Sequence, residues 1–283
     1  MTANTSTVLS DDELAERDEL AELSETGAAG TRALAAEQLD EQLEELDDDD
    51  LDDDDESGDI ELIVLDMAGT TVADGGVVER AFALAAERSG IATGEAFDAA
   101  LQYVRDTMGQ SKIDVFRVLA DGDEDAAQRG NSAFEGAYAE LVASEGVTEI
   151  TGAADVIREL RAAGASVVLT TGFSPETRTT IIDALGWHDL ADALLSPADA
   201  GRGRPHPDMP LTALLRTGTS AVDAMVVVGD TVSDVASGVN AGAGFVVGVL
   251  SGAHDRDALE AAGADAVIDS ITELPALLGL RGE

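Results

Sequence analysis

Cysteine and lysine are the residues that this sequence has least of. The 283 residues contain no cysteine, which excludes disulfides, thiolate metal ligands and cysteine nucleophiles. Lysine occurs once, as Lys112, and the other basic residues are all arginine. Arginine stays protonated, whereas lysine can lose its proton and attack a carbonyl group, so Lys112 is a candidate nucleophile. The alternative is the chance survival of a surface lysine.

Aromatic residues and long apolar runs are also scarce. Aromatic side chains make up 3% of the sequence and all hydrophobic residues together 45%, so we expect a core of valine, leucine, isoleucine and alanine. A chain of this length can bury a full core, as one large domain or as one domain with an insertion. No segment approaches the length of a membrane span, and Met1–Asp12 lacks the parts of a signal peptide. We therefore expect a soluble, cytoplasmic protein with no membrane partner.

Positive charge is the third shortage. Acidic residues outnumber basic ones 58 to 16, and the formal net charge is −42. Residues 1–58 carry 22 acidic and 2 basic side chains and residues 59–283 carry 36 and 14, so the acidity extends over the whole chain. Such a field opposes contacts with phosphate backbones, which argues against a nucleic-acid partner. An acidic surface with almost no lysine is typical of a halophilic protein, because salt screens its self-repulsion. An acidic protein of an ordinary cytosol is the alternative.

The first 58 residues are low in complexity. Asp47–Glu56 is acidic at all but one position, and such a block repels itself, so we predict a disordered acidic tail over residues 1–58. Leu39, Leu43 and Leu46 fall at helical spacing, which leaves open a helix that docks on a partner.

From Asp59 onward, apolar runs of strand length alternate with helical stretches. Nearly continuous apolar strands indicate a parallel sheet covered on both faces, so the predicted fold class is α/β with a Rossmann-like parallel sheet. The predicted strands are Ile60–Leu65, Ser166–Leu169, Ala193–Leu195, Met225–Val228, Phe245–Val249 and Ala266–Ile268.

The segment between the first two strands carries no convincing strand of its own. Its pattern predicts helices at Val77–Arg88, Glu95–Thr107, Ile113–Leu119 and Ala126–Ser144. A helical insertion after the first strand predicts a cap domain over residues 74–147. The α/β core domain then comprises residues 59–73 and 148–283.

Polar signatures follow three of the predicted strands. They are Asp66–Thr71 after the first strand, Thr170–Gly172 after the second and Gly229–Asp234 after the fourth. Arg204 stands between the last two, on the proline-stiffened segment Gly203–Pro207. Because ligands of doubly wound sheets lie outside the carboxyl ends of the strands, we expect these segments to meet in one site.

The acidic members of these segments suit a nucleophile and a metal site. Asp66 could attack phosphorus and form an aspartyl phosphate. Asp230 and Asp234, with Asp66 and the carbonyl oxygen of Ala68, offer hard oxygen ligands for Mg²⁺. The alternatives are a strand-end turn for Asp66 and a helix N-terminus for Asp230 and Asp234.

The other members suit the binding of a phosphoryl group. The Thr171 hydroxyl, the Gly172 amide and the Arg204 guanidinium can each donate hydrogen bonds to phosphoryl oxygens. The predicted partner is therefore a small phosphate or phosphonate. The sequence has no P-loop, no Gly-x-Ser-x-Gly elbow and no His-Glu-x-x-His motif.

The four motifs, in this order, resemble those of the haloacid dehalogenase superfamily of phosphohydrolases. The resemblance covers about residues 59–283 and implies a cap domain inserted after the first strand. Phosphatases of this superfamily usually carry a second aspartate two residues after the nucleophile, which protonates the leaving alkoxide. Here that position is Ala68, which cannot donate a proton.

The segment Asp66–Thr71 resembles instead the phosphonoacetaldehyde hydrolases of this superfamily. In that family a cap lysine in a Met-Gly-x-x-Lys pattern forms a Schiff base with the aldehyde, and Met108–Lys112 matches the pattern. The resemblance thus implies that Lys112 forms an imine, which lets carbon leave phosphorus as an enamine without an acid at position 68. Met108 is expected to pack against the lysine or to be a plain core methionine.

One position departs from that family. A histidine that follows the lysine by three residues serves proton transfer in the family, and this chain has Val115 there. None of the three histidines, His188, His206 and His254, lies in the predicted cap. Water or another group must therefore carry the protons, or the substrate is a different carbonyl compound.

We therefore predict a Mg²⁺-dependent hydrolase that cleaves a carbon–phosphorus bond of a phosphono-aldehyde, with Asp66 and Lys112 as catalytic residues. The resemblance leaves a homodimer open. One alternative is a phosphatase of small phosphate monoesters with a non-catalytic Lys112. An alternative of another class is a non-catalytic binding module in which the acidic tail is the functional part.

Removing residues 1–58 should leave kcat/KM unchanged, and the truncated protein should gain stability with added salt. Its unfolding temperature, followed by circular dichroism, should rise as KCl enters the molar range, because screening relieves the repulsion among 36 acidic side chains. A truncated protein that fails to fold at high salt contradicts the dispensable tail. An unfolding temperature that does not respond to KCl contradicts the halophilic surface.

Overall fold

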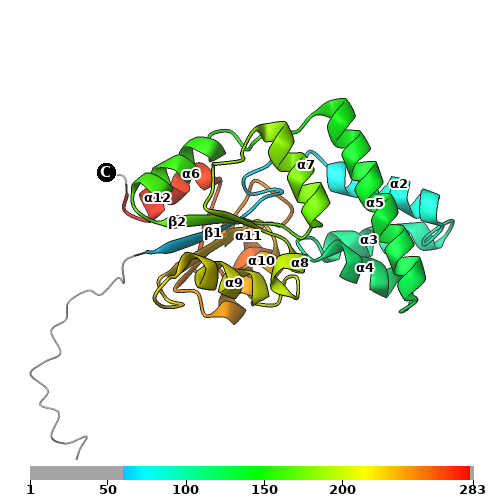
Figure 1. Cartoon of the computed structure of the whole chain (residues 1–283). Helices are drawn as coiled ribbons and strands as arrows, with labels where there is room; N and C mark the ends of the chain where they lie inside the picture. Colours follow the sequence, from blue (N-terminus) through cyan, green and yellow to red (C-terminus); the bar gives the residue numbers. More distant parts are fainter. Residues whose placement is uncertain (1–59, 281–283) are drawn as a thin grey trace, which may run out of the picture. The chain divides into compact units, whose positions relative to one another are not determined.

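A parallel sheet forms the core of the protein, shown in Figure 1 as a computed structural model that describes residues 60–280. The predicted acidic tail and the predicted docking helix, within residues 1–58, lie outside the described part. The six strands are all parallel, in the order β3-β2-β1-β4-β5-β6. They are β1 (Leu62–Asp66), β2 (Ser166–Thr170), β3 (Ala193–Leu195), β4 (Met225–Gly229), β5 (Phe245–Val249) and β6 (Ala266–Ile268). This confirms the predicted α/β class and each predicted strand.

The central strands are apolar throughout because both of their faces are covered. Every residue of β1 and β4 is buried. Successive side chains of a strand point to opposite faces. Accordingly, Ile63 and Leu65 belong to one apolar cluster, and Leu62 and Val64 belong to another. The aliphatic composition therefore supplies two layers of core, one on each side of the sheet.

Helices cover the two faces in the way that a doubly wound sheet requires. In Figure 1, α6 and α12 lie over one face, and α9 and α10 lie over the other. The helices outside the segment between β1 and α6 are α6 (Ala153–Ala162), α7 (Pro175–Leu185), α8 (Pro197–Ala200), α9 (Asp208–Thr217), α10 (Val232–Ala241), α11 (Arg256–Ala261), the 3₁₀ helix η2 (Ile271–Glu273) and α12 (Leu274–Leu277).

The strand order reverses between β1 and β4, and this point fixes the place of the site. β1 connects through β2 toward one edge of the sheet and β4 through β5 toward the other. Loops that leave such neighbouring strands in opposite directions open a crevice at their carboxyl ends. β1 and β4 pair in register, with Leu65 beside Val228, so Asp66 and Asp230 emerge side by side.

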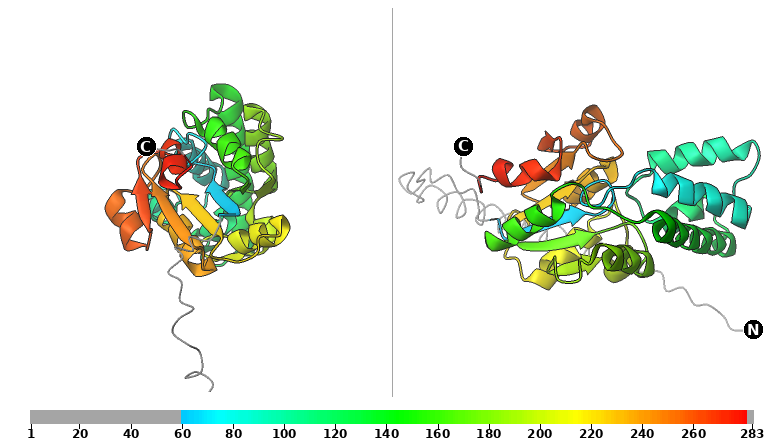
Figure 2. Two further views of the ribbon diagram at one scale, coloured as in Figure 1. Left: turned by 90° about the vertical axis from the view of Figure 1, so that its left-hand side faces the viewer. Right: turned by 90° about the horizontal axis from the view of Figure 1, so that it is seen from above.

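Four helices fill the segment between β1 and α6, which we call the cap. They are α2 (Val77–Ser89), α3 (Ala96–Asp106), α4 (Lys112–Leu119) and α5 (Glu124–Glu145). Each confirms a predicted helix to within two residues. Figure 2 shows these helices together beyond the carboxyl ends of the strands. The boundaries at residues 74 and 147 remain our interpretation.

Most of the aromatic residues gather in the cap, whereas Trp187 and Phe245 belong to the sheet domain. Phe116 of α4 contacts Phe82 of α2 and Phe134 of α5, with ring centroids 6.0 and 6.2 Å apart. Phe173, from the loop after β2, joins this cluster through Tyr138 at 4.8 Å and Phe134 at 6.1 Å. A residue of the sheet domain thus packs inside the aromatic core of the cap.

Glycines let the turn before α4 lie directly on loops of the sheet domain. The Lys112 amide donates to the Gly172 carbonyl oxygen at 3.2 Å. A Cβ atom on Gly172 would lie 2.5 Å from the Gln110 carbonyl oxygen, and one on Gly203 would lie 2.6 Å from the Ser111 Cβ. Only residues without a side chain allow this approach, so the glycines set how closely the two parts meet.

Within the described residues, no helix is long and apolar enough to cross a membrane.

Replacing Gly203 by alanine should lower stability by about 1–3 kcal/mol, because the added methyl group overlaps Ser111 in a packed contact. Gly136→Ala is the matched control, since nothing lies within 4 Å of its Cβ position on α5. Alanine favours a helix interior over glycine, so the control should gain about 0.5–1 kcal/mol. Urea unfolding measures both. Equal stability of Gly203→Ala and the natural protein would show that the turn does not dock this closely.

Candidate active site

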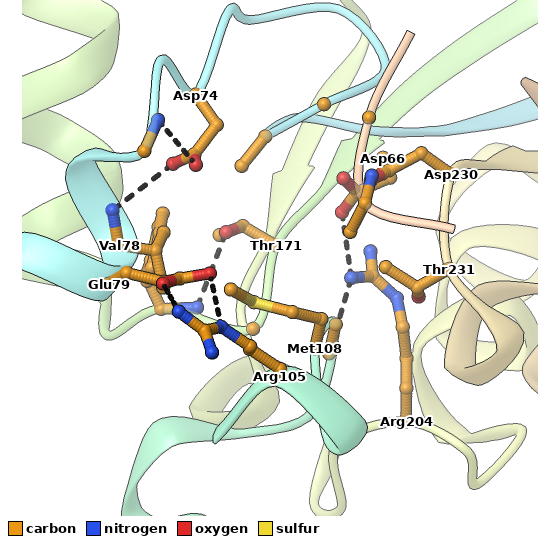
Figure 3. Close-up of a pocket in the computed structure, with 18 of the residues that line it drawn as sticks. Asp66, Asp74, Val78, Glu79, Arg105, Met108, Thr171, Arg204, Asp230 and Thr231 are labelled. Atoms are coloured by element: carbon orange, nitrogen blue, oxygen red, sulfur yellow. Dashed lines mark hydrogen bonds and ion pairs between the residues drawn. The ribbon is translucent and has the colours of Figure 1, made fainter. Parts of the chain in front are cut away.

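A cavity of about 350 Å³ lies at the carboxyl ends of the central strands, beneath the cap. Figure 3 shows Asp66, Asp230 and Arg204 on one side of it and Asp74 on the other. All but one of the predicted site residues line this cavity: Asp66, Ala68, Met108, Lys112, Thr171, Gly172, Arg204 and Asp230. Asp234 lies behind them and reaches the site through Arg204.

Asp66 ends β1 and points into the cavity with only 5% of its surface exposed. Its Oδ1 lies 2.7 Å from Arg204 Nη1. Burial raises the pKa of the Asp66 carboxyl well above its ordinary value, and the Arg204 charge opposes this rise. The neighbouring carboxylates of Asp234 and Asp230 raise the Asp66 pKa further. The nucleophile candidate therefore sits among more negative charge than one arginine neutralises.

Asp230 follows β4 and is held by the loops around it. Its Oδ1 accepts from the Thr70 hydroxyl at 3.1 Å, and its Oδ2 accepts from the Ala253 amide at 2.8 Å. Burial, followed by the Asp234 charge, raises the pKa of Asp230 to about 7. A Cβ atom on Gly69 or on Gly252 would lie 2.3 or 2.0 Å from Asp230 Oδ2. Two glycine positions are thus required to seat this carboxylate.

Asp234 serves two purposes at the start of α10. It forms a capping box with Thr231, in which Asp234 Oδ2 accepts from the Thr231 amide and hydroxyl and the Asp234 amide donates to the Thr231 hydroxyl. Asp234 therefore stands at a helix N-terminus, and this position leaves its predicted metal role untested. Its Oδ1 lies 2.8 Å from Arg204 Nε. The same residue therefore caps the helix and orients the arginine.

The three carboxylates fit a divalent cation. Asp66, Asp230 and Asp234 each offer an oxygen within 4.8 Å of the others, and all three are buried. Arg204 is the only cation that ion-pairs with any of them within residues 60–280. Buried carboxylates are stable when paired or bound to a metal, and a cluster of carboxylate oxygens is the ligand type that Mg²⁺ prefers.

Arg204 is fixed on several sides. Besides the two carboxylates, its Nη2 donates to the Thr170 hydroxyl at 2.5 Å and its Nη1 to the Gly109 carbonyl oxygen at 3.4 Å. Arg204 therefore links β2, Asp66 and the turn before α4. Thr171, the next residue along the chain after Thr170, is buried, and its hydroxyl oxygen accepts from the Phe173 amide at 3.3 Å.

Lys112 is the first residue of α4 and lines the cavity with 8% of its surface exposed. Its Nζ makes no hydrogen bond or ion pair with any described residue and lies 5.6 Å from the centre of the Phe173 ring. Burial lowers the pKa of Lys112 to about 8. The Arg204 charge also lowers the Lys112 pKa, whereas the charges of Asp74 and Asp66 raise it.

No histidine lines the cavity. Val115, at the position of the family's histidine, is buried in the apolar part of the cap. His206 is not among the lining residues, and the His254 Nδ1 accepts from the Val232 amide at 2.9 Å. The departure noted in the sequence is therefore real in the structure, and no histidine from elsewhere fills the gap.

Sequence reasoning missed several lining residues. Asp74 stands ahead of α2 and binds its first amides, a role that its position before a helical run could have revealed. Glu79 and Arg105 pair across α2 and α3 at 2.7 Å on the same side. The loop Ser251–Ala253 follows β5 and carries no motif that would have singled it out.

Comparisons with known proteins agree with this site. Residues 60–242 match the family model of haloacid dehalogenase-like hydrolases. A phosphonoacetaldehyde hydrolase of Bacillus cereus is 31% identical over 69% of this chain and 78% of its own length. A bifunctional phosphonoacetaldehyde hydrolase/aminoethylphosphonate transaminase of Clostridioides difficile is 30% identical over 69% of this chain, but the match spans only 32% of that protein.

A solved structure extends the likeness to three dimensions. A phosphonoacetaldehyde hydrolase-like protein from Oleispira antarctica superimposes with a TM-score of 0.67 at 25% identity, over 78% of this chain and 92% of that one. The sheet order, the strand-end carboxylates and these matches lead to the same assignment. The chain belongs to the haloacid dehalogenase-like hydrolases, in their phosphonatase-like branch.

Proposed function

We propose that this protein is a Mg²⁺-dependent hydrolase that cleaves the carbon–phosphorus bond of phosphonoacetaldehyde or a related phosphono-aldehyde. One observation carries the proposal. The chain's single lysine is buried in the same cavity as the strand-end carboxylate Asp66, with a pKa lowered to about 8. An amine of this kind exists partly in its neutral form near neutral pH and can attack an aldehyde.

The first step joins Lys112 to the substrate. The neutral amine adds to the aldehyde carbon, the carbonyl electrons move to oxygen, and loss of water gives a cationic imine. The imine withdraws electrons from the neighbouring carbon, which is the carbon bound to phosphorus. The Lys112 side chain is buried and its Nζ lies near the Phe173 ring, so little water reaches the amine.

The second step belongs to Asp66. A carboxylate oxygen forms a bond to phosphorus, the carbon–phosphorus bond breaks, and its electron pair becomes the double bond of an enamine. Protonation of the enamine and hydrolysis of the imine release the aldehyde, and water hydrolyses the aspartyl phosphate. The leaving group needs no acid from position 68, which agrees with Ala68 lining the cavity.

The remaining predicted residues bind the phosphoryl group and the metal. Thr171, the Gly172 amide and Arg204 hold the phosphoryl oxygens, and Met108 lines the cavity beside them. Asp66, Asp230 and Asp234, with the Ala68 carbonyl, would hold Mg²⁺. The ion offsets negative charge where the anionic nucleophile meets the anionic substrate.

A phosphatase of small monoesters is the second candidate, because the same carboxylates and Arg204 serve either reaction. Ala68 counts against it, since an alkoxide leaving group needs a proton that alanine cannot give. A binding module that acts through its acidic tail is not supported by the assembled site. A cytoplasmic location, a halophilic surface and a homodimer remain predictions.

Borohydride reduction in the presence of phosphonoacetaldehyde should attach mass to the one peptide that contains Lys112. Labelling should accelerate as pH rises through about 8, because the amine is neutral above its pKa. Lys112→Arg keeps the charge but should lose the label and lower phosphonate turnover by about three orders of magnitude or more. Mass spectrometry and phosphate release measure the two effects.

Asp66→Asn is the control for that experiment. It should still be labelled at Lys112 but release no phosphate, which separates the imine from the phosphoryl transfer. Phosphonate hydrolysis by Lys112→Arg at an unchanged rate would rule out the imine. A natural protein that is not labelled and hydrolyses only phosphate esters would establish the phosphatase alternative.

Asp230→Asn should weaken Mg²⁺ binding by about 10-fold or more, because the variant removes one charge from a three-carboxylate cluster. Titration calorimetry with MgCl₂ measures the affinity, and EDTA should abolish turnover until Mg²⁺ is restored. Asp155→Asn removes an equal charge from the exposed face of α6 and should change neither the Mg²⁺ affinity nor the turnover. Turnover that survives EDTA would contradict a metal-dependent reaction.

A further inference from the structure

The proposed reaction needs a proton carrier that no histidine provides. Imine formation begins with a lysine ammonium ion and ends with an iminium ion and a water molecule. Two protons must therefore leave nitrogen and reach oxygen, one before and one after the carbon–nitrogen bond forms. Val115 is buried and apolar, and no histidine lines the cavity. The carrier has to be sought among the acids around Lys112, and this search rests on the proposed function.

Asp74 stands in the right place. It lies in the turn between β1 and α2 and lines the same cavity as Lys112. Figure 3 shows its carboxylate on the cap side, across the cavity from Asp66. Its Oδ2 accepts from the Gly76 amide at 3.1 Å, and its Oδ1 accepts from the Val78 amide at 3.2 Å. These bonds fix the carboxylate, and each oxygen keeps a second lone pair for another donor.

The other acids that line the cavity are already committed. Glu79 is held by Arg105 in a two-point ion pair, at 3.0 and 2.7 Å. Asp66 pairs with Arg204, and both oxygens of Asp230 are bound on the opposite side. Asp74 makes no ion pair within residues 60–280. Asp230 has no cationic partner either, but it belongs to the carboxylate cluster, so Asp74 is the lining carboxylate of the described residues that lacks a cationic partner on the cap side.

The electrostatics agree with this placement. Asp74 is the strongest of the charged groups that act on Lys112, and its charge raises the Lys112 pKa. Asp66 and Asp234 act in the same direction, and Arg204 opposes them. A carboxylate that favours an ammonium ion at this position also favours the iminium ion that replaces it. Asp74 is therefore suited to balance the charge of the product. No hydrogen bond or ion pair joins Asp74 to Nζ, so protons would pass between them through a water molecule in the cavity that both residues line.

We propose that Asp74 is the catalytic acid–base group of the imine step. Within the cavity that the two residues line, its carboxylate takes a proton from the Lys112 ammonium ion through a bridging water molecule, and the neutral amine then bonds to the aldehyde carbon. Protonated Asp74 returns that proton to the resulting oxyanion. It next takes a proton from nitrogen and gives it to the hydroxyl group, which leaves as water while the nitrogen lone pair forms the carbon–nitrogen double bond. Ammonium and aldehyde become iminium and water, and Asp74 ends as a carboxylate.

Asp74→Asn is the sharpest test, because asparagine has the same size and keeps one of the two acceptor oxygens that bind the Gly76 and Val78 amides, but cannot exchange protons. The probe is phosphonoacetaldehyde, and the readout is the rate at which borohydride traps the Lys112 adduct. We expect trapping to slow by about 100-fold, and Asp74→Glu to recover part of the rate. Asp123→Asn is the matched control, since Asp123 caps α5 by accepting from the Ala126 amide at 3.0 Å and does not line the cavity.

A second variant separates proton transfer from structure. Asp74→Ala should be as slow as Asp74→Asn, and added formate should accelerate it, because a small carboxylate can enter the vacated space. Equal trapping rates in Asp74→Asn and the natural protein would overturn the role of Asp74, as would a slow Asp74→Ala that formate does not rescue. If the natural protein itself traps nothing at Lys112, the proposed function fails and this role fails with it.

Discussion

The burial of like charges at one point of the sheet is the constraint on which the rest of the site depends. Three carboxylates share a space in which their oxygens lie within 4.8 Å of one another, and one arginine pairs with two of them. Burial of this kind is unfavourable unless every charge has a partner. The surrounding residues supply hydrogen-bond donors and space. Thr70 and the Ala253 amide donate to Asp230, and two glycines leave room for its carboxylate.

The cap also removes the Lys112 amine from contact with water. The turn before α4 reaches the sheet domain only because Gly172 and Gly203 have no side chains. The contact that delivers Lys112 to the cavity also buries it, and burial is the largest cause of its lowered pKa. Phe173 completes this arrangement because it stands two residues after Thr171 and packs inside the cap. Positioning and activation of the amine therefore have one structural origin.

The sequence predicted those parts of the molecule in which the local residue pattern alone determines the structure. Apolar runs gave the strands within two residues, and the polar residues that end β1, β2 and β4 meet where the strand order reverses. Asp74 was not predicted as a site residue because its position before a helical run indicates only a helix cap. The cavity that it lines forms when the cap folds onto the sheet domain. The same holds for Phe173, whose neighbours Tyr138 and Phe134 come from a distant helix.

Charge balance links the part of the site on the sheet domain with the part on the cap. Asp66, Asp230, Asp234 and Asp74 bring four carboxylates, while Arg204 and Lys112 bring two cations. An anionic phosphonate entering this cavity, in a chain of net charge −42, meets repulsion from all sides. In the proposed reaction, a divalent cation at the carboxylate cluster would remove the excess negative charge on the sheet side, and the iminium at Lys112 would keep a positive charge on the cap side. The proposed substrate would then lie between two positive centres, and each of them would face acids that hydrogen bonds already hold in place.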